Sequence, residues 1–348
     1  MKNSRLILIA SLSLAAASAQ AAKVSLLETG STLLYPLFNL WVPVYTHLHP
    51  NVQITTQGTG SGTGIAEAIS GVAQIGASDA YMSDAQIKQN PNIVNIPLAI
   101  SAQNINYNIP GLNKIHLKLN GPVLAGIYGG QITRWNDPKI AKLNPGVKLP
   151  AHKIIPIHRT DGSGDTFIFS QYLSFSTPSW NNQVGYGTTI SWPAVQGGLG
   201  AEGNPGMVQA SQQNPYSVAY IGVSFTKQAD QAGLGTAMIE NRAGRFLLPS
   251  ATTIGAAAAQ LVNKTPVDER ISLVFAPGAS SYPIINYEYA IINKNQASPA
   301  VAQALRAFLT WALSRQGGNA PRFLNAVHFI ALPTRIAQLS SKQIAEIH

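Results

Sequence analysis

The chain has 348 residues, of which 45% are hydrophobic and 11% are charged, and its formal net charge is +9. This length suits two lobes better than a single core. The composition argues against a disordered chain, because such chains are rich in charge and poor in apolar residues. The Lys and Arg residues are scattered, with the densest set in RAGR at 242–245, so we expect no nucleic-acid partner.

Residues 1–21 have the pattern of a secretion signal. Lys2 and Arg5 precede the twelve-residue apolar run LILIASLSLAAA, and Ala19 and Ala21 supply the small residues of a cleavage site. The run is shorter than the roughly 20 residues that a membrane-spanning helix needs; a buried core helix is the alternative interpretation. We expect cleavage near Ala21, which leaves a mature chain with a net charge of +7.

The sequence contains no cysteine. An exported chain of this kind folds without disulfides, and it carries no lipid on an N-terminal cysteine. No second apolar stretch reaches membrane length. We therefore expect a soluble periplasmic protein that is not a lipoprotein, and release outside the cell remains an alternative.

The predicted elements alternate between strand and helix from the start of the mature chain. Strands are predicted at 23–30, 51–58 and 73–80, and helices at 33–48 and 65–70. Pro36 suits the first turn of the first helix, whereas Pro43 predicts a kink in it. This alternation is typical of an α/β fold with a largely parallel sheet.

Two apolar extended segments, 104–111 and 282–293, lie far apart in the sequence and are predicted to be strands that pass between lobes. The first lobe would then combine residues 22–105 and 288–348, and the second would comprise residues 106–287. The last lobe 1 segment includes a helix predicted at 299–315 from its 3.6-residue period.

Three glycine-rich loops are predicted to join strands to helices, at 29–32, 58–64 and 161–165. In α/β sheets, ligands bind beyond the carboxyl ends of strands, where such loops lead into helices. Helix N-termini present unpaired N–H groups, and glycines let the backbone approach a ligand closely. The hydroxyls of Thr32, Ser61 and Ser163 add neutral donors, and Arg159 adds a charged fork that suits tetrahedral oxyanions.

Carboxylates near these loops narrow the choice of anion. Asp79 and Asp165 would repel a fully ionised oxyanion, so they make sense if the ligand carries a proton to donate. Phosphate carries at least one near neutral pH and sulfate carries none. A buried, unpaired carboxylate acceptor costs about 1–3 kcal/mol or more and would reject sulfate. Asp161 is better placed to orient Arg159 than to touch the ligand.

Each signal has a plain structural alternative when it is taken singly. Glycine-serine loops are usually turns, an Arg-x-Asp pair is usually a surface ion pair, and Asp79 could cap a helix. The functional interpretation depends on three loops of matched chemistry on one α/β framework.

Four blocks of the sequence resemble the periplasmic phosphate-binding proteins, the substrate-binding components of phosphate ABC transporters: GSTLLYPLF, QGTGSGTGI, IGASDAY and HRTDGSGDTFIFSQYLS. LNPGVKLP and GYGTTISWPAVQGG are also similar to this family, so the resemblance spans essentially the whole mature chain. It implies a type II Venus-flytrap fold, with two lobes of mixed sheets and flanking helices. It also implies a monomer without a cofactor or metal, whose partners are inorganic phosphate and the transporter's membrane subunits.

The resemblance also implies roles for individual residues. Phosphate would receive hydrogen bonds from Thr32, the Leu33 backbone, Ser61, Ser163 and Gly164. Asp79 would accept the phosphate proton, and Arg159 would pair with both phosphate and Asp161.

Three positions depart from the common family pattern. Leu33 stands where many members have Phe, which a backbone donor tolerates. Asp165 stands where many have Thr, and we hypothesise that it is a second proton acceptor favouring monobasic phosphate. Tyr81 replaces the commoner Pro, and its ring is a candidate for packing at the cleft.

Other functions remain as alternatives. An exported phosphatase or a phosphate-ester-binding protein could use the same anion cage, but Ser61 and Ser163 have no base nearby in the sequence, and G-x-S-x-G is absent. His158 is expected to point away from Arg159 by strand alternation. A receptor for sulfate or molybdate is disfavoured by Asp79, and an adhesin or matrix protein is disfavoured by the complete cage.

Overall fold

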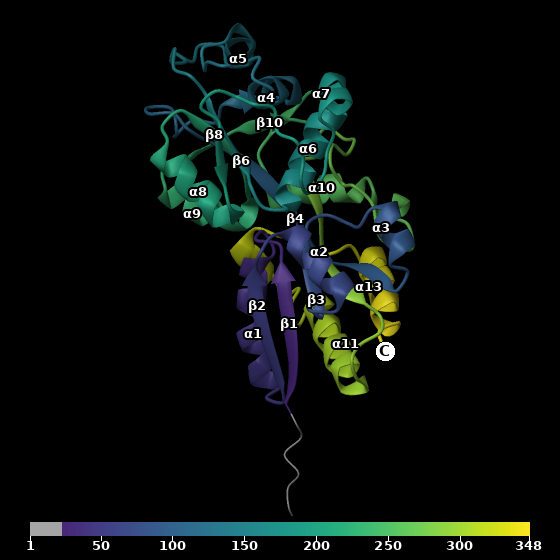
Figure 1. Ribbon diagram of the computed structural model, residues 1–348. Helices are drawn as coiled ribbons and strands as arrows, with labels where there is room; N and C mark the ends of the chain where they lie inside the picture. The colour runs from purple at the N-terminus through teal and green to yellow at the C-terminus, as the bar shows by residue number, and fades with distance from the viewer. Residues whose placement is uncertain (1–22) are drawn as a thin grey trace, which may run out of the picture.

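The computed structural model describes residues 23–348, so the predicted signal segment 1–21 lies outside the described residues. The described chain forms two lobes stacked end to end, with the beginning and the end of the chain together in one of them (Figure 1). This arrangement is the α/β two-lobed fold predicted from the sequence. Within residues 23–348, no helix combines the length and the apolar character needed to cross a membrane.

The two lobes share one continuous sheet. In the described part of the chain it has nine strands in the order β2-β1-β3-β12-β4-β8-β6-β7, with β9 also paired to β4. The pairs β1–β2, β1–β3, β6–β7 and β6–β8 are parallel, whereas β12 and β8 run antiparallel to β4. The sheet is therefore mixed, and its parallel parts lie in the two lobes on either side of the antiparallel centre.

The long strand β4 (Ile93–Asn108) connects the lobes. Its first part pairs with β12 (Ile285–Asn293) as far as Ala102, and its last part pairs with β8 (Ser217–Gly222) from Gln103 onward. The two apolar segments predicted to pass between lobes thus belong to neighbouring strands. The partner of β4 changes a few residues before the boundary we predicted at 105, which we keep as a proposed division.

The first lobe is built from both ends of the chain. Its remaining strands are β1 (Val24–Gly30), β2 (Val52–Gly58) and β3 (Ile75–Ser78), and its helices are α1 (Tyr35–Leu48), α2 (Ser61–Ser70), α3 (Asp84–Gln89), α11 (Pro299–Leu313), α12 (Pro321–Leu324) and α13 (Thr334–Ala345), with the 3-10 turn η3 (Asn325–Val327). Helix α1 forms because its apolar residues recur at helical spacing, and it buries Leu37, Phe38, Trp41 and Tyr45. It continues across Pro43 as one helix.

The second lobe comes from the middle of the chain. Its remaining strands are β5 (Lys118–Leu119), β6 (Ile155–Arg159), β7 (Leu199–Ala201), β9 (Gly235–Thr236), β10 (Met238–Glu240) and β11 (Phe246–Leu247), and its helices are α4 (Gly121–Tyr128), α5 (Pro138–Leu143), α6 (Gly164–Ser176), α7 (Pro178–Gln183), α8 (Gly203–Gln213), α9 (Thr226–Gln231) and α10 (Ala251–Ala259), with η1 (Val223–Phe225) and η2 (Val262–Lys264). Strands β5, β10 and β11 form a separate small sheet.

Two helices begin inside the glycine loops that the sequence singled out. Helix α2 begins at Ser61, four residues before the predicted start at 65, because Gly60 makes the turn with a φ of +92°. Helix α6 begins at Gly164, with Ser163 as its N-cap. Both N-termini face the boundary between the lobes, which is where the candidate site lies.

Candidate functional site

The three predicted loops meet between the lobes. Thr32, Ser61 and Asp79 come from the first lobe, and Arg159, Ser163 and Asp165 come from the second; each is at most 6% exposed. The Gly62 N–H donates to the Gly162 carbonyl across the boundary at 2.8 Å. A Cβ at Gly60 would lie 2.6 Å from Asp161 Oδ2, so glycine permits this close approach of the two lobes.

Arg159, at the end of β6, is held by two carboxylates. Its Nε donates to Asp161 Oδ1 at 2.6 Å and its Nη2 donates to Asp161 Oδ2, which makes a bidentate pair. Its Nη1 donates to Asp165 Oδ2 at 2.6 Å. Burial alone would lower the pKa of Arg159, but the hydrogen bond to Asp161 and the charges of Asp165 and Asp161 raise it above its ordinary value. The guanidinium is therefore permanently charged and fixed in orientation.

Asp165, in the first turn of α6, accepts hydrogen bonds from three side chains. Oδ2 accepts from Arg159 and from Asn204 Nδ2 at 2.7 Å, and Oδ1 accepts from Gln103 Nε2 at 2.8 Å. Burial raises the pKa of Asp165, and the charge of Arg159 with the donors Gln103 and Asn204 partly offsets that rise. These donors stabilise the carboxylate form, which is the form that can accept a proton.

Asp79 follows β3 and faces Asp165 from the other lobe. Its Oδ1 accepts from Ser31 Oγ, its Oδ2 lies 3.5 Å from Ser61 Oγ, and its backbone N–H donates to Ser61 Oγ at 3.2 Å. Burial, followed by the negative charge of Asp165, raises the pKa of Asp79 to about 7. Asp79 can therefore exchange a proton near neutral pH.

A further carboxyl group lies behind this pair. Glu288, in β12, accepts a hydrogen bond from Ser101 and is fully buried. Burial raises its pKa well above the ordinary value, and the charge of Asp79 raises it further. Both causes favour the protonated form of Glu288, because a second full negative charge beside Asp79 would be costly.

The predicted donors differ in how they are used. The Ser163 hydroxyl accepts from the Thr166 N–H at 3.1 Å, which leaves its proton free to donate. The Leu33 N–H instead donates to Ser31 Oγ at 3.1 Å. A Cβ at Gly164 would lie 2.5 Å from Ser61 Oγ and closer still to Asp79 Oδ2. The Gly164 backbone is therefore pressed against the first lobe's half of the site.

Three polar residues that the sequence analysis did not single out belong to this network. Ser31 lies in the first glycine loop, and its hydroxyl donates to Asp79. Its position next to Thr32 in that loop could have identified it as a site residue from the sequence. Gln103 lies in β4 and Asn204 in α8, and both bind Asp165. Nothing in their local sequence marks them, because they reach the site only through pairing of strands and packing of helices that are distant in the chain.

Two residues discussed from the sequence lie around the site. The His158 ring stacks on Trp192 with centroids 5.0 Å apart, away from the loops, as strand alternation predicts. The Tyr81 ring packs edge-on against Phe167 of α6 at 5.3 Å. Tyr81 thus contacts the second lobe beside the site.

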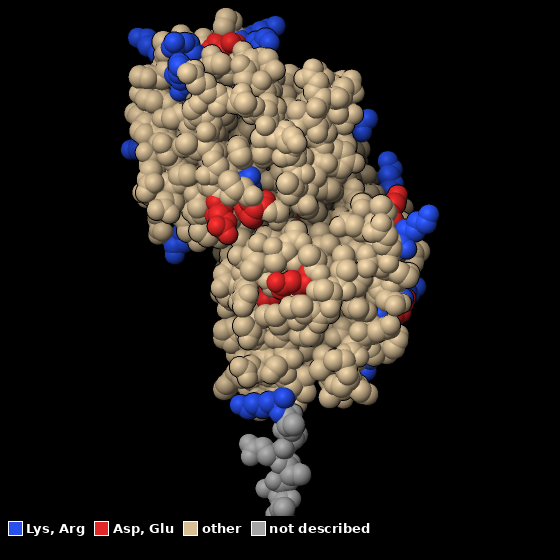
Figure 2. Space-filling model, viewed as in Figure 1, with Lys and Arg blue, Asp and Glu red and all other residues tan. Residues whose placement is uncertain are grey.

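Charged side chains are unevenly distributed over the face of the molecule that Figure 2 shows. Most of this face carries neither sign of charge, and basic atoms lie mainly toward the periphery. One group of acidic atoms lies where the lobes meet, and another lies on the face of the lower lobe. Within residues 23–348, no three His, Asp or Glu side chains are grouped in a way that could hold a metal ion.

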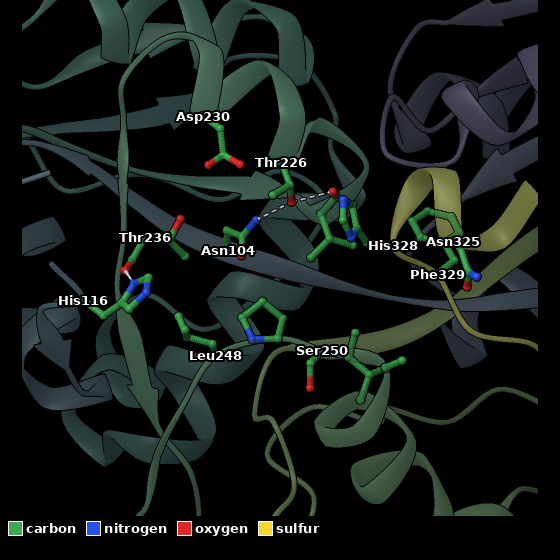
Figure 3. Close-up of a pocket in the computed structure, with 14 residues that line it drawn as sticks. Asn104, His116, Thr226, Asp230, Thr236, Leu248, Ser250, Asn325, His328 and Phe329 are labelled. Carbon is green, nitrogen blue, oxygen red and sulfur yellow. Dashed lines mark hydrogen bonds between the residues drawn. The ribbon is translucent and has the colours of Figure 1, made fainter. Parts of the chain in front are cut away.

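A separate cavity of about 430 Å³ lies on the other side of β4 (Figure 3). Asn104 lines it and donates to Thr226 Oγ1 at 3.0 Å, whereas the preceding residue, Gln103, reaches Asp165. Successive residues of a strand point to opposite faces, so β4 separates the cavity from the site. The cavity is lined by no residue of the three glycine loops.

The two-lobed fold, with a buried polar cluster between the lobes, is typical of the periplasmic-binding class, and a family model described as the PBP superfamily domain matches residues 15–316. The chain is 35% identical over 329 residues to the phosphate-binding protein PstS of Methanocaldococcus jannaschii, covering 89% of this chain and 83% of the relative. It is 34% identical over 309 residues to PstS of Pasteurella multocida, covering 89% and 86%. It therefore belongs to the PstS family of phosphate-binding proteins.

A solved structure supports the fold. PfluDING, a high-affinity periplasmic phosphate-binding protein bound with phosphate, matches with a TM-score of 0.72 at 18% identity, covering 90% of this chain and 92% of that one. The lobes and their connection are thus those of a known binding-protein architecture, as the sequence resemblance predicted.

Proposed function

We propose that the protein is an exported periplasmic receptor that binds inorganic phosphate between its lobes and delivers it to the membrane subunits of a phosphate ABC importer. The observation that carries this proposal is the placement of Asp79 and Asp165, from opposite lobes, around the buried guanidinium of Arg159. A permanent cation beside carboxylates suits an anion that is itself a proton donor. Membership of the PstS family supports the same ligand.

The proposed roles follow from the contacts. Arg159 supplies the charge that attracts the anion, and Asp161 holds the guanidinium in place. Hydroxyl and backbone donors surround the ligand oxygens; they are Thr32, Leu33, Ser61, Ser163 and Gly164. The Leu33 N–H would exchange its bond to Ser31 for one to phosphate. No covalent step and no cofactor is required.

The carboxylates set the specificity. Asp79 accepts the first ligand proton, and Asp165 accepts a second when monobasic phosphate is bound. Sulfate offers no proton to either group, so a carboxylate would face an anion as an unpaired acceptor. An unsatisfied buried polar group costs about 1–3 kcal/mol, more when charged, which corresponds to about 5- to 160-fold in affinity.

Calorimetric titration of phosphate-stripped protein tests the proposal. We expect saturable binding of one phosphate per chain, and sulfate affinity lower by about tenfold or more. Comparable binding of both anions would contradict the placement of the carboxylates, and absence of phosphate binding would overturn the function. Turnover of a chromogenic phosphate ester by the same sample would instead support the phosphatase alternative, which the family's binding-protein names do not favour.

A further inference from the structure

Asn204, the second residue of α8, ties the two half-sites together. It is fully buried, and its side chain and backbone make four hydrogen bonds to the site or its frame. Its backbone N–H and its Nδ2 donate to Thr32 Oγ1 of the first lobe, at 3.1 and 3.0 Å. The same Nδ2 donates to Asp165 Oδ2 at 2.7 Å, and Oδ1 accepts from the Gly222 N–H at 2.8 Å.

These contacts fix the direction of the Thr32 hydroxyl. A hydroxyl has one proton to donate and two lone pairs that accept. Both lone pairs of Thr32 Oγ1 are taken by Asn204 donors. Within residues 23–348, the Thr32 hydroxyl proton has no hydrogen-bond acceptor. Thr32 is therefore left as a donor only, which is the state that an anion requires.

The contacts also cross between lobes. Thr32 lies in the loop after β1, and Asn204 lies in α8 of the second lobe. Gly203, next to Asn204, donates its N–H to Asp161 Oδ1 at 3.1 Å, so α8 is anchored to the carboxylate that holds Arg159. The Thr32 hydroxyl is thus oriented when the lobes come together.

We propose that Asn204 is a positioning residue of the anion site, which makes the Thr32 hydroxyl an obligate donor to the bound anion on lobe closure. This inference rests on the proposed function, since it concerns how the same site holds an oxyanion. Asn204 acts through Thr32, and its contact with Asp165 keeps that carboxylate beside Arg159.

A double-mutant cycle with inorganic phosphate as the ligand tests this inference. Asn204→Ala keeps the backbone N–H donor but removes Nδ2, which frees one lone pair of Thr32 Oγ1 and lets the hydroxyl proton turn away from the ligand; phosphate binding should weaken about tenfold. In a Thr32→Val background, which has no hydroxyl to orient, the same Asn204→Ala change should cost clearly less affinity, because only the contact with Asp165 remains to be lost. Equal losses in both backgrounds would show a merely structural role and would overturn the inference.

A second variant covers the case in which Asn204→Ala fails to fold. Asn204→Asp keeps the side-chain volume and the acceptor for the Gly222 N–H, but it presents a carboxylate oxygen to Thr32 Oγ1 in place of a donor. The Thr32 proton would then turn to this carboxylate and away from the ligand. We expect Asn204→Asp to lose at least as much phosphate affinity at pH 8 as Asn204→Ala; affinity equal to that of wild type would overturn the inference.

Asn241 provides a matched control, because it is a buried asparagine of the same lobe whose Nδ2 donates to the carbonyls of Gly278, Ala279 and Ser281. Asn241→Ala should lower the melting temperature and leave the phosphate dissociation constant within about twofold. The wild type separates the two proposals: if it binds no phosphate, the proposed function fails. If it binds phosphate and the Asn204 variants bind equally well, only the role of Asn204 fails.

Discussion

At the scale of single residues, we propose that one carboxylate, Asp79, decides which anion the site accepts. Asp79 is buried, and its pKa is raised to about 7 by burial and by the charge of Asp165. Its ionised oxygens can accept a ligand proton but have nothing to offer an unprotonated oxygen. Asp79→Asn replaces one acceptor with an N–H donor of the same shape. We expect phosphate affinity to fall and sulfate affinity to rise, so that the ratio of the two narrows by at least about tenfold.

Calorimetry with both anions measures this ratio, and Asp84→Asn is the matched control. The Asp84 side chain is 96% exposed and pairs with Arg270, and an exposed pair of this kind contributes little to stability. Asp84→Asn should leave both affinities unchanged. An unchanged ratio in Asp79→Asn would mean that Asp79 does not face the ligand.

Asp165 should set the pH dependence of binding. If the bound ligand is monobasic phosphate, it donates one proton to Asp79 and one to Asp165. Above neutral pH free phosphate is mainly dibasic, so binding then takes up one proton from water. Affinity should then tighten by up to about tenfold for each pH unit as pH falls from 9 toward neutrality. Asp165→Thr removes the second acceptor, so its affinity should be nearly independent of pH in this range. Titrations at three or more pH values give the slopes, and parallel slopes in the two proteins would refute the second-acceptor role.

At the scale of elements, the N-terminus of α6 packs so closely against the first lobe that it leaves no space for a side chain at Gly164. The position of a Cβ at Gly164 would be 2.5 Å from Ser61 Oγ and 2.6 Å from Asp79 Cβ, distances that real side chains do not adopt. Gly164→Ala should therefore hold the lobes apart and weaken phosphate binding by about tenfold or more, with little effect on the melting temperature of the ligand-free protein. Titration and thermal melting measure the two effects.

A glycine within another helix supplies the control. In α10, a Cβ at Gly255 would find its nearest neighbour, Ile330 Cδ1, at 3.9 Å. Gly255→Ala should leave phosphate affinity unchanged and stabilise the protein by about 0.5–1 kcal/mol, because alanine is the better helix former. Wild-type affinity in Gly164→Ala would show that the closed lobes can separate slightly without losing the ligand.

The elements also show which parts of the fold can be predicted from the sequence. The periodicity of α1 and the alternation of strands and helices were readable because they are local patterns that burial on one face imposes. The glycine loops at 29–32 and 161–165 indicated where β1 and β6 end. The exact start of α2 was not readable, because it depends on the positive φ of Gly60 and on its contact with Asp161. Gln103 and Asn204 were missed for a related reason, since their function arises from contacts more than 35 positions away in the chain.

At the scale of the whole molecule, the site exists only when the lobes are together. Asp79 belongs to one lobe and Arg159 with Asp165 to the other, so a ligand that bridges them selects the closed arrangement by its contacts with both. The sheet passes from one lobe to the other through β4, whose pairing changes from β12 to β8 between Ala102 and Gln103. We propose that the lobes rotate about this change of partner when the site opens.

Closure of the ligand-free protein should itself depend on pH. In the closed arrangement the pKa of Asp79 is about 7, against an ordinary value of 3.8 when the carboxyl is exposed, and burial and the charge of Asp165 both act in this direction. The pKa values of Asp165 and Glu288 are also raised, while Arg159 remains charged. The closed form therefore binds protons that an open form releases. By linkage, closure is favoured below the ordinary carboxyl pKa and this advantage is lost as pH rises through about 7.

Small-angle scattering of phosphate-stripped protein measures this effect. We expect the radius of gyration to be larger at pH 8 than at pH 5, and phosphate to bring it to the smaller value at both. Asp79→Asn carries no charge at this position at either pH, so its radius should change less between them. A radius that is independent of pH in the wild type would mean that repulsion between Asp79 and Asp165 does not oppose closure. The ligand's contacts with both lobes would then be sufficient to set the balance between open and closed forms.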